Sequence, residues 1–273
     1  MNRKTEMFLL ILLTVTLGFF AVKALPTEPP GTFLETDSIY LSTGAFMDEN
    51  NVSGNMLNQE LMGNFIIFKL FPKYRVFTDS RYLNVAVFFD GYDMFYAIKE
   101  PSPEKDLAYT KSLIEASIAN LKGEGGKNFS EEYWYRLLDK YKIDFIVSKV
   151  THPRSGQLFP LFLKLMHDDT WKLVYSDGNA VIMIKDNGKN DALIKNFPPQ
   201  NKNLLYDEAI KETITKNTSQ AYETLAYAFL MKGDIENADI FAKNALAISK
   251  NRTIAKACLQ FIDILKKQNR QAD

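Results

Sequence analysis

Two charged residues, Asp79 and Arg81, have the position and spacing of a polar binding site. They lie at the end of residues 75–79, whose β-branched and aromatic composition predicts a strand. Open α/β sheets bind ligands beyond the carboxyl ends of their strands, so this pair can bind a sugar or a loop of a partner protein. The preferred alternative is structural: Asp79 caps the next helix, and Arg81 pairs with a nearby acid.

Other residues capable of chemistry do not form a recognisable site. Asp90 and Asp93 could hold a divalent cation but lack the oxygen spacing of a calcium loop, so a solvated turn is the preferred interpretation. The only histidines, His152 and His167, have no short fixed spacing, which disfavours a zinc site or a nucleophilic triad. The sequence contains no Gly-x-Ser-x-Gly elbow and no glycine-rich phosphate loop. We therefore expect no catalytic residue, no metal and no cofactor.

Strand and helix patterns alternate between residues 40 and 190. Strands are predicted at 54–58, 75–79, 144–150, 171–176 and 180–184, and helices at 42–47, 84–98, 103–122, 130–141 and 158–167. The apolar run 65–70 fits either type of element. Asp177-Gly178 is a hairpin turn between the last two strands. The pattern predicts an α/β domain with an open, mostly parallel sheet and an antiparallel edge hairpin.

An all-helical region is predicted at residues 203–270, after a boundary at 187–203 that contains two adjacent prolines. Its apolar and small residues have the spacing of a tetratricopeptide repeat, which it resembles. These residues are Tyr222, Leu225, Ala226, Phe229, Gly233, Ala238, Phe241 and Ala245. Asn251 departs from the proline frequent in that family. The resemblance implies a docking surface for a protein, with Tyr222, Leu225, Phe229 and Phe241 as its candidate residues, and a generic helical hairpin is the alternative.

The amino-terminal residues 1–25 have the composition of a membrane or export segment. Residues 7–22 carry no charge and follow Arg3 and Lys4, which predicts an amino terminus on the cytoplasmic side. A single-pass anchor is the preferred interpretation, and a secretory signal cleaved after Ala24 is the alternative. Residues 26–39 form a proline-containing linker. The remaining chain is then expected outside the cytoplasm, at the periplasmic side or cell surface.

Composition limits the classes of partner. Thirty-three basic and thirty-three acidic residues balance, and no aromatic-interleaved basic patch occurs, so nucleic acid binding is not expected. The single cysteine, Cys258, cannot form an intramolecular disulfide. Export without disulfides is more typical of a bacterial envelope than of a disulfide-stapled secreted domain.

The stretch 58–81 resembles a segment that follows the last membrane span of large bacterial polytopic proteins of the lipid-linked-sugar glycosyltransferase (GT-C) type. The matching positions are Asn58, Gly63, Leu70, Pro72, Val76, Phe77, Asp79 and Arg81. Asn64 and Ser80 replace two glycines of the family pattern. Residues 134–144 resemble the family's helix–strand unit and residues 171–181 its final hairpin, so the resemblance covers about residues 40–190. A tetratricopeptide tail is also common in that family.

This resemblance implies a soluble extracytoplasmic domain without the catalytic part, which lies in membrane loops that this chain lacks. We therefore expect a non-catalytic envelope protein with an interaction or scaffold role beside glycan machinery, bound to a protein partner and to the membrane through its amino-terminal segment. The alternative is an accessory or degenerate glycosyltransferase domain that binds a glycan acceptor through Asn58, Asp79 and Arg81. A polar cleft at the carboxyl edge of the sheet would favour this alternative.

Overall fold

The structure is a computed structural model that describes residues 40–81, 83–124 and 129–272. The predicted anchor and linker, residues 1–39, lie outside these described residues. Within the described ranges, no helix combines the length and the apolar composition that a membrane crossing requires. Residues from Tyr40 onward form one compact unit, which includes both the predicted α/β region and the predicted helical region.

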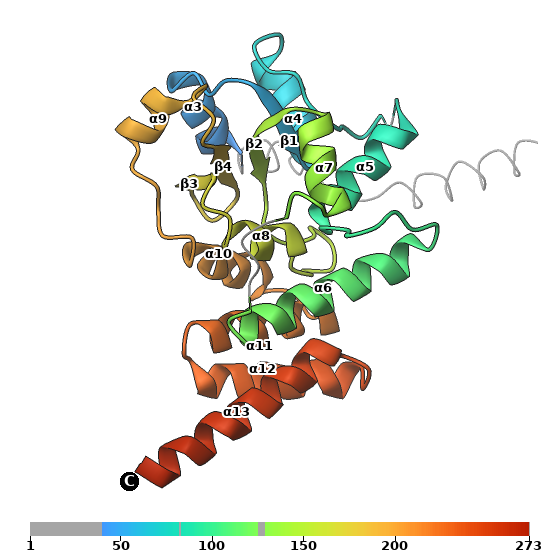
Figure 1. Ribbon diagram of the computed structural model, residues 1–273, viewed down its shortest axis with the longest axis vertical. Helices are drawn as coiled ribbons and strands as arrows, with labels where there is room; N and C mark the ends of the chain where they lie inside the picture. Colours follow the sequence, from blue (N-terminus) through green and yellow to red (C-terminus); the bar gives the residue numbers. More distant parts are fainter. Residues whose placement is uncertain (1–39, 82, 125–128, 273) are drawn as a thin grey trace, which may run out of the picture. The chain divides into compact units, whose positions relative to one another are not determined.

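A four-stranded sheet lies at the centre of the α/β region (Figure 1). It consists of β1 (Asn55–Asn58), β2 (Ile143–Ser148), β3 (Trp171–Ser176) and β4 (Val181–Lys185), in the order β1-β2-β4-β3. β1 and β2 are parallel, whereas β4 is antiparallel to both β2 and β3. The α/β class and the closing hairpin are confirmed. The prediction of a mostly parallel sheet is wrong, because only one of the three strand pairs is parallel.

The predicted strand at residues 75–79 does not form. The apolar run before it belongs to helix α4 (Glu60–Leu70), and residues 75–79 return along that helix as a loop. The side chain of Asn58 binds the backbone of this loop: its Oδ1 accepts from Phe77 N at 2.7 Å and its Nδ2 donates to Thr78 O at 2.8 Å. Because a side chain satisfies these backbone groups, the loop needs no neighbouring strand.

Gly63 allows α4 to lie close to this loop. A Cβ atom at position 63 would overlap the carbonyl oxygen of Thr78 and would lie 2.8 Å from Asn58 Nδ2. The overlapping oxygen belongs to the backbone, so no side-chain rotation relieves the clash. The packing of α4 on the loop therefore depends on the absence of a side chain at this position.

We expect Gly63→Ala to lower the free energy of unfolding by about 1–3 kcal/mol, the usual effect of overpacking. Urea denaturation measures this change. Gly91→Ala is the matched control, since Gly91 is also helical and an added Cβ would lie 3.2 Å from a ring carbon of Phe77. Alanine favours a helix interior by roughly 0.5–1 kcal/mol over glycine, so the control should stay near wild type. Equal losses in both variants would contradict the packing argument.

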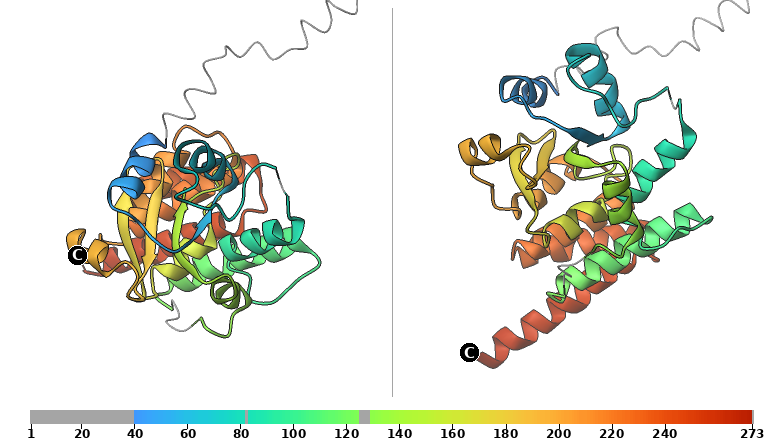
Figure 2. Two further views of the ribbon diagram at one scale, coloured as in Figure 1. Left: turned by 90° about the horizontal axis from the view of Figure 1, so that it is seen from above. Right: turned by 45° about the horizontal axis from the view of Figure 1, so that its top comes forward.

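The other helices surround the sheet and continue into the carboxyl-terminal region (Figures 1 and 2). Their bounds are α3 (Leu41–Glu49), α5 (Val85–Phe95), α6 (Lys105–Leu121), α7 (Tyr133–Lys140), α8 (Pro160–Leu165), α9 (Asp191–Asn196), α10 (Leu204–Thr213), α11 (Ser219–Met231), α12 (Ile235–Ile248) and α13 (Thr253–Ala272). α5 packs on α7 and α8, and α6 packs on α8 and α13. α3 and α9 lie beside β3, where Phe46 contacts the rings of Tyr175 and Phe197.

The helical region after residue 203 is confirmed as helical. α11 packs against α12 and α13, and the turn between α11 and α12 contains Gly233 with a φ of +81°. The buried alanines Ala226 and Ala238 permit close approach of these helices. The resemblance to a tetratricopeptide repeat stays a prediction. The predicted boundary at 187–203 contains α9, which begins after Asn190, and the Asn190 side chain bonds Ser53 beside β1.

Candidate functional site

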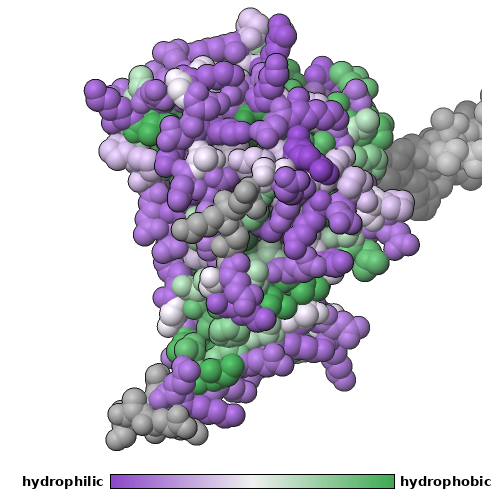
Figure 3. Space-filling view, in the orientation of Figure 1, coloured by the Kyte–Doolittle hydropathy of each residue, from purple (hydrophilic) through white to green (hydrophobic). Residues whose placement is uncertain are grey.

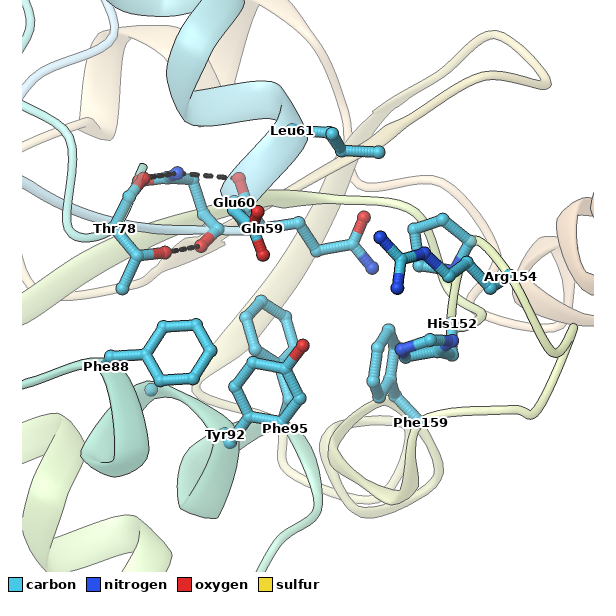
Figure 4. Close-up of a pocket in the computed structure, with 13 residues that line it drawn as sticks. Gln59, Glu60, Leu61, Thr78, Phe88, Tyr92, Phe95, His152, Arg154 and Phe159 are labelled. Atoms are coloured by element: carbon cyan, nitrogen blue, oxygen red, sulfur yellow. Dashed lines mark hydrogen bonds between the residues drawn. The ribbon is translucent and has the colours of Figure 1, made fainter. Parts of the chain in front are cut away.

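A cavity of about 160 Å³ opens at the carboxyl ends of the two parallel strands, β1 and β2. Three segments enclose it: the start of α4, one face of α5, and the loop that follows β2 (Figure 4). Its lining residues are Asn58, Gln59, Glu60, Leu61, Thr78, Phe88, Gly91, Tyr92, Phe95, His152, Pro153, Arg154 and Phe159. This is the place where open α/β sheets bind ligands.

Aromatic rings form one side of the cavity. Helix α5 begins at its cap Asn84, whose Oδ1 accepts from Ala86 N and Val87 N, and this start places Phe88 and Tyr92 one turn apart. Their ring centroids are 4.8 Å apart. Figure 4 shows both rings facing the cavity, together with Phe159. The two ring planes are inclined by 46°, and together they form an apolar wall that can lie against a ring-shaped ligand.

The opposite side is polar and begins where β1 becomes α4. Gln59 is the extended residue before the helix, and its amide binds the loop after β2, with Nε2 donating to Thr151 O at 3.2 Å. Glu60 is the first helical residue, where the helix dipole stabilises a carboxylate. Among the described residues, the Glu60 side chain forms no hydrogen bond or ion pair, so its carboxylate oxygens are available to a ligand.

The loop after β2 contributes His152 and Arg154. It is held in shape by the bridge between Thr151 and Leu158 and by a hydrogen bond of 2.7 Å from His152 N to Gln157 O. Figure 4 shows the Arg154 guanidinium pointing toward Gln59, and the guanidinium has no acidic partner in the part of the chain that the structure describes. Arg154 therefore offers free donors at the cavity.

The protonation states of His152 and Tyr92 in the cavity depend on their burial and on the charged side chains near them. Burial lowers the pKa of His152, and Lys216 and Arg154 lower it further, so the imidazole is neutral near pH 7. Its Nδ1 accepts from Ser155 N at 3.3 Å, which leaves Nε2 as the protonated nitrogen. Burial also raises the pKa of Tyr92, and Glu60 adds to this rise. Tyr92 therefore remains a phenol that can donate a hydrogen bond.

The carboxyl-terminal helices position the loop of the cavity. Glu212, buried in α10, accepts hydrogen bonds from Val150 N at 3.0 Å, Thr151 N at 2.9 Å and Thr151 Oγ1 at 2.7 Å. Burial raises the pKa of Glu212 to about 7, although these hydrogen bonds oppose the rise. Further along the loop, Lys216 Nζ donates to Pro153 O and Thr218 Oγ1 donates to Ser155 O, each at 2.6 Å. The helical region is thus part of the support of the site.

The residues predicted for a glycan site are placed differently by the structure. Asp79 and Arg81 lie in the loop before α5 and pair with each other, with Oδ1 of Asp79 accepting from Arg81 Nε at 2.9 Å and Oδ2 accepting from Nη2 at 2.7 Å. Neither lines the cavity, and Asn84, not Asp79, caps α5. Asn58 does line it, but its side chain is fully committed to the backbone of Phe77, Thr78 and Gln59.

The predicted interaction residues of the tail lie mostly against one another. Leu225 is fully buried and presents no surface to a partner. The ring of Phe241 contacts those of Tyr222 and Phe229, with centroids 5.9 Å and 5.5 Å apart. Apolar side chains do reach the surface in the region of α6 and α13 (Figure 3), and Ile264 of α13 is half exposed.

The acidic pair Asp90 and Asp93 does not form a solvated turn, because both lie in helix α5. Asp90 accepts from Lys140 Nζ at 2.8 Å, and the buried Asp93 accepts from Lys105 Nζ at 2.5 Å. Each carboxylate therefore has its own cation. The described residues contain no group of three or more His, Cys, Asp or Glu side chains arranged to hold a metal ion.

Sequence reasoning missed Gln59, Glu60 and Arg154 as candidate site residues. The rule that places ligands at strand ends was applied to residues 75–79, which do not form a strand. Applied to the strands that do form, it selects the residues after Asn58 and after Ser148, and both segments line the cavity. From the sequence alone, His152, in the second segment, is a candidate only for a metal site or a nucleophilic triad.

Comparison of the chain with protein-family models, with curated proteins and with solved structures gave no match.

Proposed function

We propose that this protein is a non-catalytic envelope protein that binds a glycan in the cavity at the carboxyl ends of β1 and β2. The observation that carries this proposal is an aromatic wall that faces polar side chains across one small space, two of which, Glu60 and Arg154, have no side-chain partner among the described residues. Sugar rings present C–H groups on their faces and hydroxyl groups at their edges. Phe88 and Tyr92 fit the faces, while Glu60, His152 and Arg154 fit the hydroxyl groups.

Charge and size support a neutral sugar unit. Glu60 and Arg154 contribute one charge of each sign, and the neutral His152 adds none. The cavity volume of about 160 Å³ is below the ~300 Å³ at which pockets for drug-sized ligands begin. It therefore suits one ring of a longer chain. Of the two predicted roles, the cavity favours the binding of a glycan acceptor, through lining residues that do not include Asp79 and Arg81.

The lining also supports binding in preference to hydrolysis. Most glycoside hydrolases need two carboxyl groups, one on each side of the scissile bond. Glu60 is the single carboxylate among the residues that line the cavity. Asp79, the acid predicted from sequence for a glycan site, is paired with Arg81 outside that lining. The second carboxyl group that such hydrolysis uses is missing from the residues that line the cavity, which favours ligand recognition.

A scaffold role for the helical region is the second candidate, supported by the apolar surface in the region of α6 and α13 (Figure 3). The two roles are compatible, because Glu212 and Lys216 of the helical region hold the loop after β2 but do not line the cavity. Location in the envelope rests on the amino-terminal residues and remains part of the proposal.

The test is a calorimetric titration of the full-length protein with each member of a panel of bacterial envelope oligosaccharides. We expect Arg154→Gln to weaken binding by about 10- to 100-fold, since a hydrogen bond from a charged group contributes about 1.5–3 kcal/mol. Arg81→Gln is the matched control and should bind like wild type, because Arg81 lies outside the cavity lining. Loss of binding in Arg81→Gln alone would indicate that the binding site is in the loop before α5. No binding of any oligosaccharide by the wild-type protein would refute the proposal.

A further inference from the structure

Two large aromatic side chains are exposed at the carboxyl end of α4. Phe68 is 71% exposed and Phe71 is 67% exposed. Neither belongs to the glycan cavity or to the core. Two neighbouring exposed phenylalanines are unusual on a surface that contacts only water, because large apolar side chains are normally covered.

Cations surround these rings. Lys69 Nζ lies 4.7 Å from the centre of the Phe68 ring. Lys73 and Arg75 lie in the loop that follows α4. Lys73 pairs with Asp48 at 2.6 Å, whereas Lys69 and Arg75 have no acidic partner among the described residues. Aromatic rings flanked by long cationic side chains are suited to the interface of a membrane, where rings enter the headgroup layer and cations meet lipid phosphates.

The described chain starts at Tyr40, whose ring centroid lies 5.9 Å from that of Phe65 in α4. The uncharged residues 7–22 are followed by 17 residues before Tyr40, a length that spans at most about 60 Å. α3 starts at Leu41 and packs against α4. If residues 7–22 enter a bilayer, the tether therefore brings the end of α4 within reach of its surface, and tethering raises the effective concentration for a weak second contact.

We propose that Phe68, Lys69, Phe71, Lys73 and Arg75, the aromatic–basic patch, dock on the surface of an anionic lipid bilayer. The two phenylalanines enter the interface, and Lys69 and Arg75 bind headgroup phosphates. Helix α4 joins this patch to the glycan cavity, which lies at its other end. Its 11 residues span about 16 Å, so docking sets the height of the cavity above the lipid. The proposal does not depend on the identity of the cavity's ligand.

The experiment uses the full-length protein in nanodiscs with an environment-sensitive fluorophore on an introduced cysteine. Cys258, the one native cysteine, is fully buried and stays unlabelled. Phe71→Cys reports on the patch, and Ile248→Cys is the matched control, since Ile248 is 57% exposed at the end of α12. Figure 1 shows α4 and α12 at opposite ends of the described unit. Brominated lipids quench a fluorophore that enters the bilayer.

We expect quenching of the label at position 71 in nanodiscs that contain phosphatidylglycerol and none at position 248. Each cation near an anionic leaflet strengthens binding roughly fivefold, so Lys69→Gln with Arg75→Gln should lower the docked-to-undocked ratio roughly 25-fold. Phe68→Cys is the second labelled variant, and circular dichroism checks folding of both. Equal quenching at 71 and 248, or a label change that depends on protein concentration and not on lipid, would overturn the proposal.

Discussion

Replacing Glu212 by alanine is expected to lower the free energy of unfolding by about 3–5 kcal/mol and to abolish ligand binding at a cavity that Glu212 does not line. The buried carboxylate accepts from Val150 N, Thr151 N and Thr151 Oγ1. Alanine leaves these donors without partners in the interior, and each orphaned group costs about 1–3 kcal/mol. The same bonds hold the loop of His152 and Arg154, so the polar side of the cavity loses its position.

Urea denaturation and oligosaccharide titration of the full-length protein measure the two effects. Glu49→Ala is the matched control, because Glu49 is an exposed glutamate at the end of α3. Its effect should stay within about 0.5 kcal/mol, as for most surface substitutions. An alanine variant at position 212 with wild-type stability, or with wild-type affinity, would show that the helical region does not support the site.

The change Asn58→Asp is expected to destabilise the protein by about 3–5 kcal/mol at neutral pH, the range for an unpaired buried charge. Asn58 is fully buried, and its Nδ2 donates to the carbonyl oxygens of Gln59 and Thr78, both at 2.8 Å. Aspartate has the same size but no donor, so a carboxylate would face two carbonyl oxygens. Its folded-state pKa would rise above the ordinary value of about 3.9, and the loss of stability would therefore grow as the pH rises above that value.

Denaturation of both proteins between acidic and neutral pH tests this prediction. The control is Asn201→Asp, since Asn201 is exposed and its Oδ1 accepts from Asn203 N at 2.9 Å, a role that aspartate retains. The control should show no such pH-dependent deficit. If Asn58→Asp were as stable as its control across this range, the role assigned to Asn58 in holding the loop of Thr78 would be wrong.

Elements with a strong local pattern could be predicted from the sequence. The fully buried β2 and the hairpin of β3 and β4 have continuous β-forming residues and an Asp-Gly turn, and they lie close to the predicted positions. Residues 75–79 have a strand-like composition as well. Their conformation depends on hydrogen bonds to the side chain of Asn58, about twenty residues earlier in the chain. The composition of residues 75–79 alone cannot predict that contact.

The candidate site was predictable only in its general place. The rule that ligands bind at strand ends selects Asp79 and Arg81 when residues 75–79 are taken as a strand, and it selects the cavity residues when it is applied to β1 and β2. The contribution of Glu212 could not be predicted, since a glutamate in an amphipathic helix normally faces solvent. Its burial depends on a loop that lies more than sixty residues earlier in the sequence.

The support that Glu212, Lys216 and Thr218 give to the loop after β2 has a consequence for biosynthesis. A chain made from its amino terminus contains every residue of the cavity once Phe159 has been synthesised, yet the residues that hold the loop follow more than fifty positions later. The cavity therefore matures only after α10 and the start of α11 have emerged. A product truncated before that point would contain the complete set of cavity residues without the contacts that hold the loop after β2 in place.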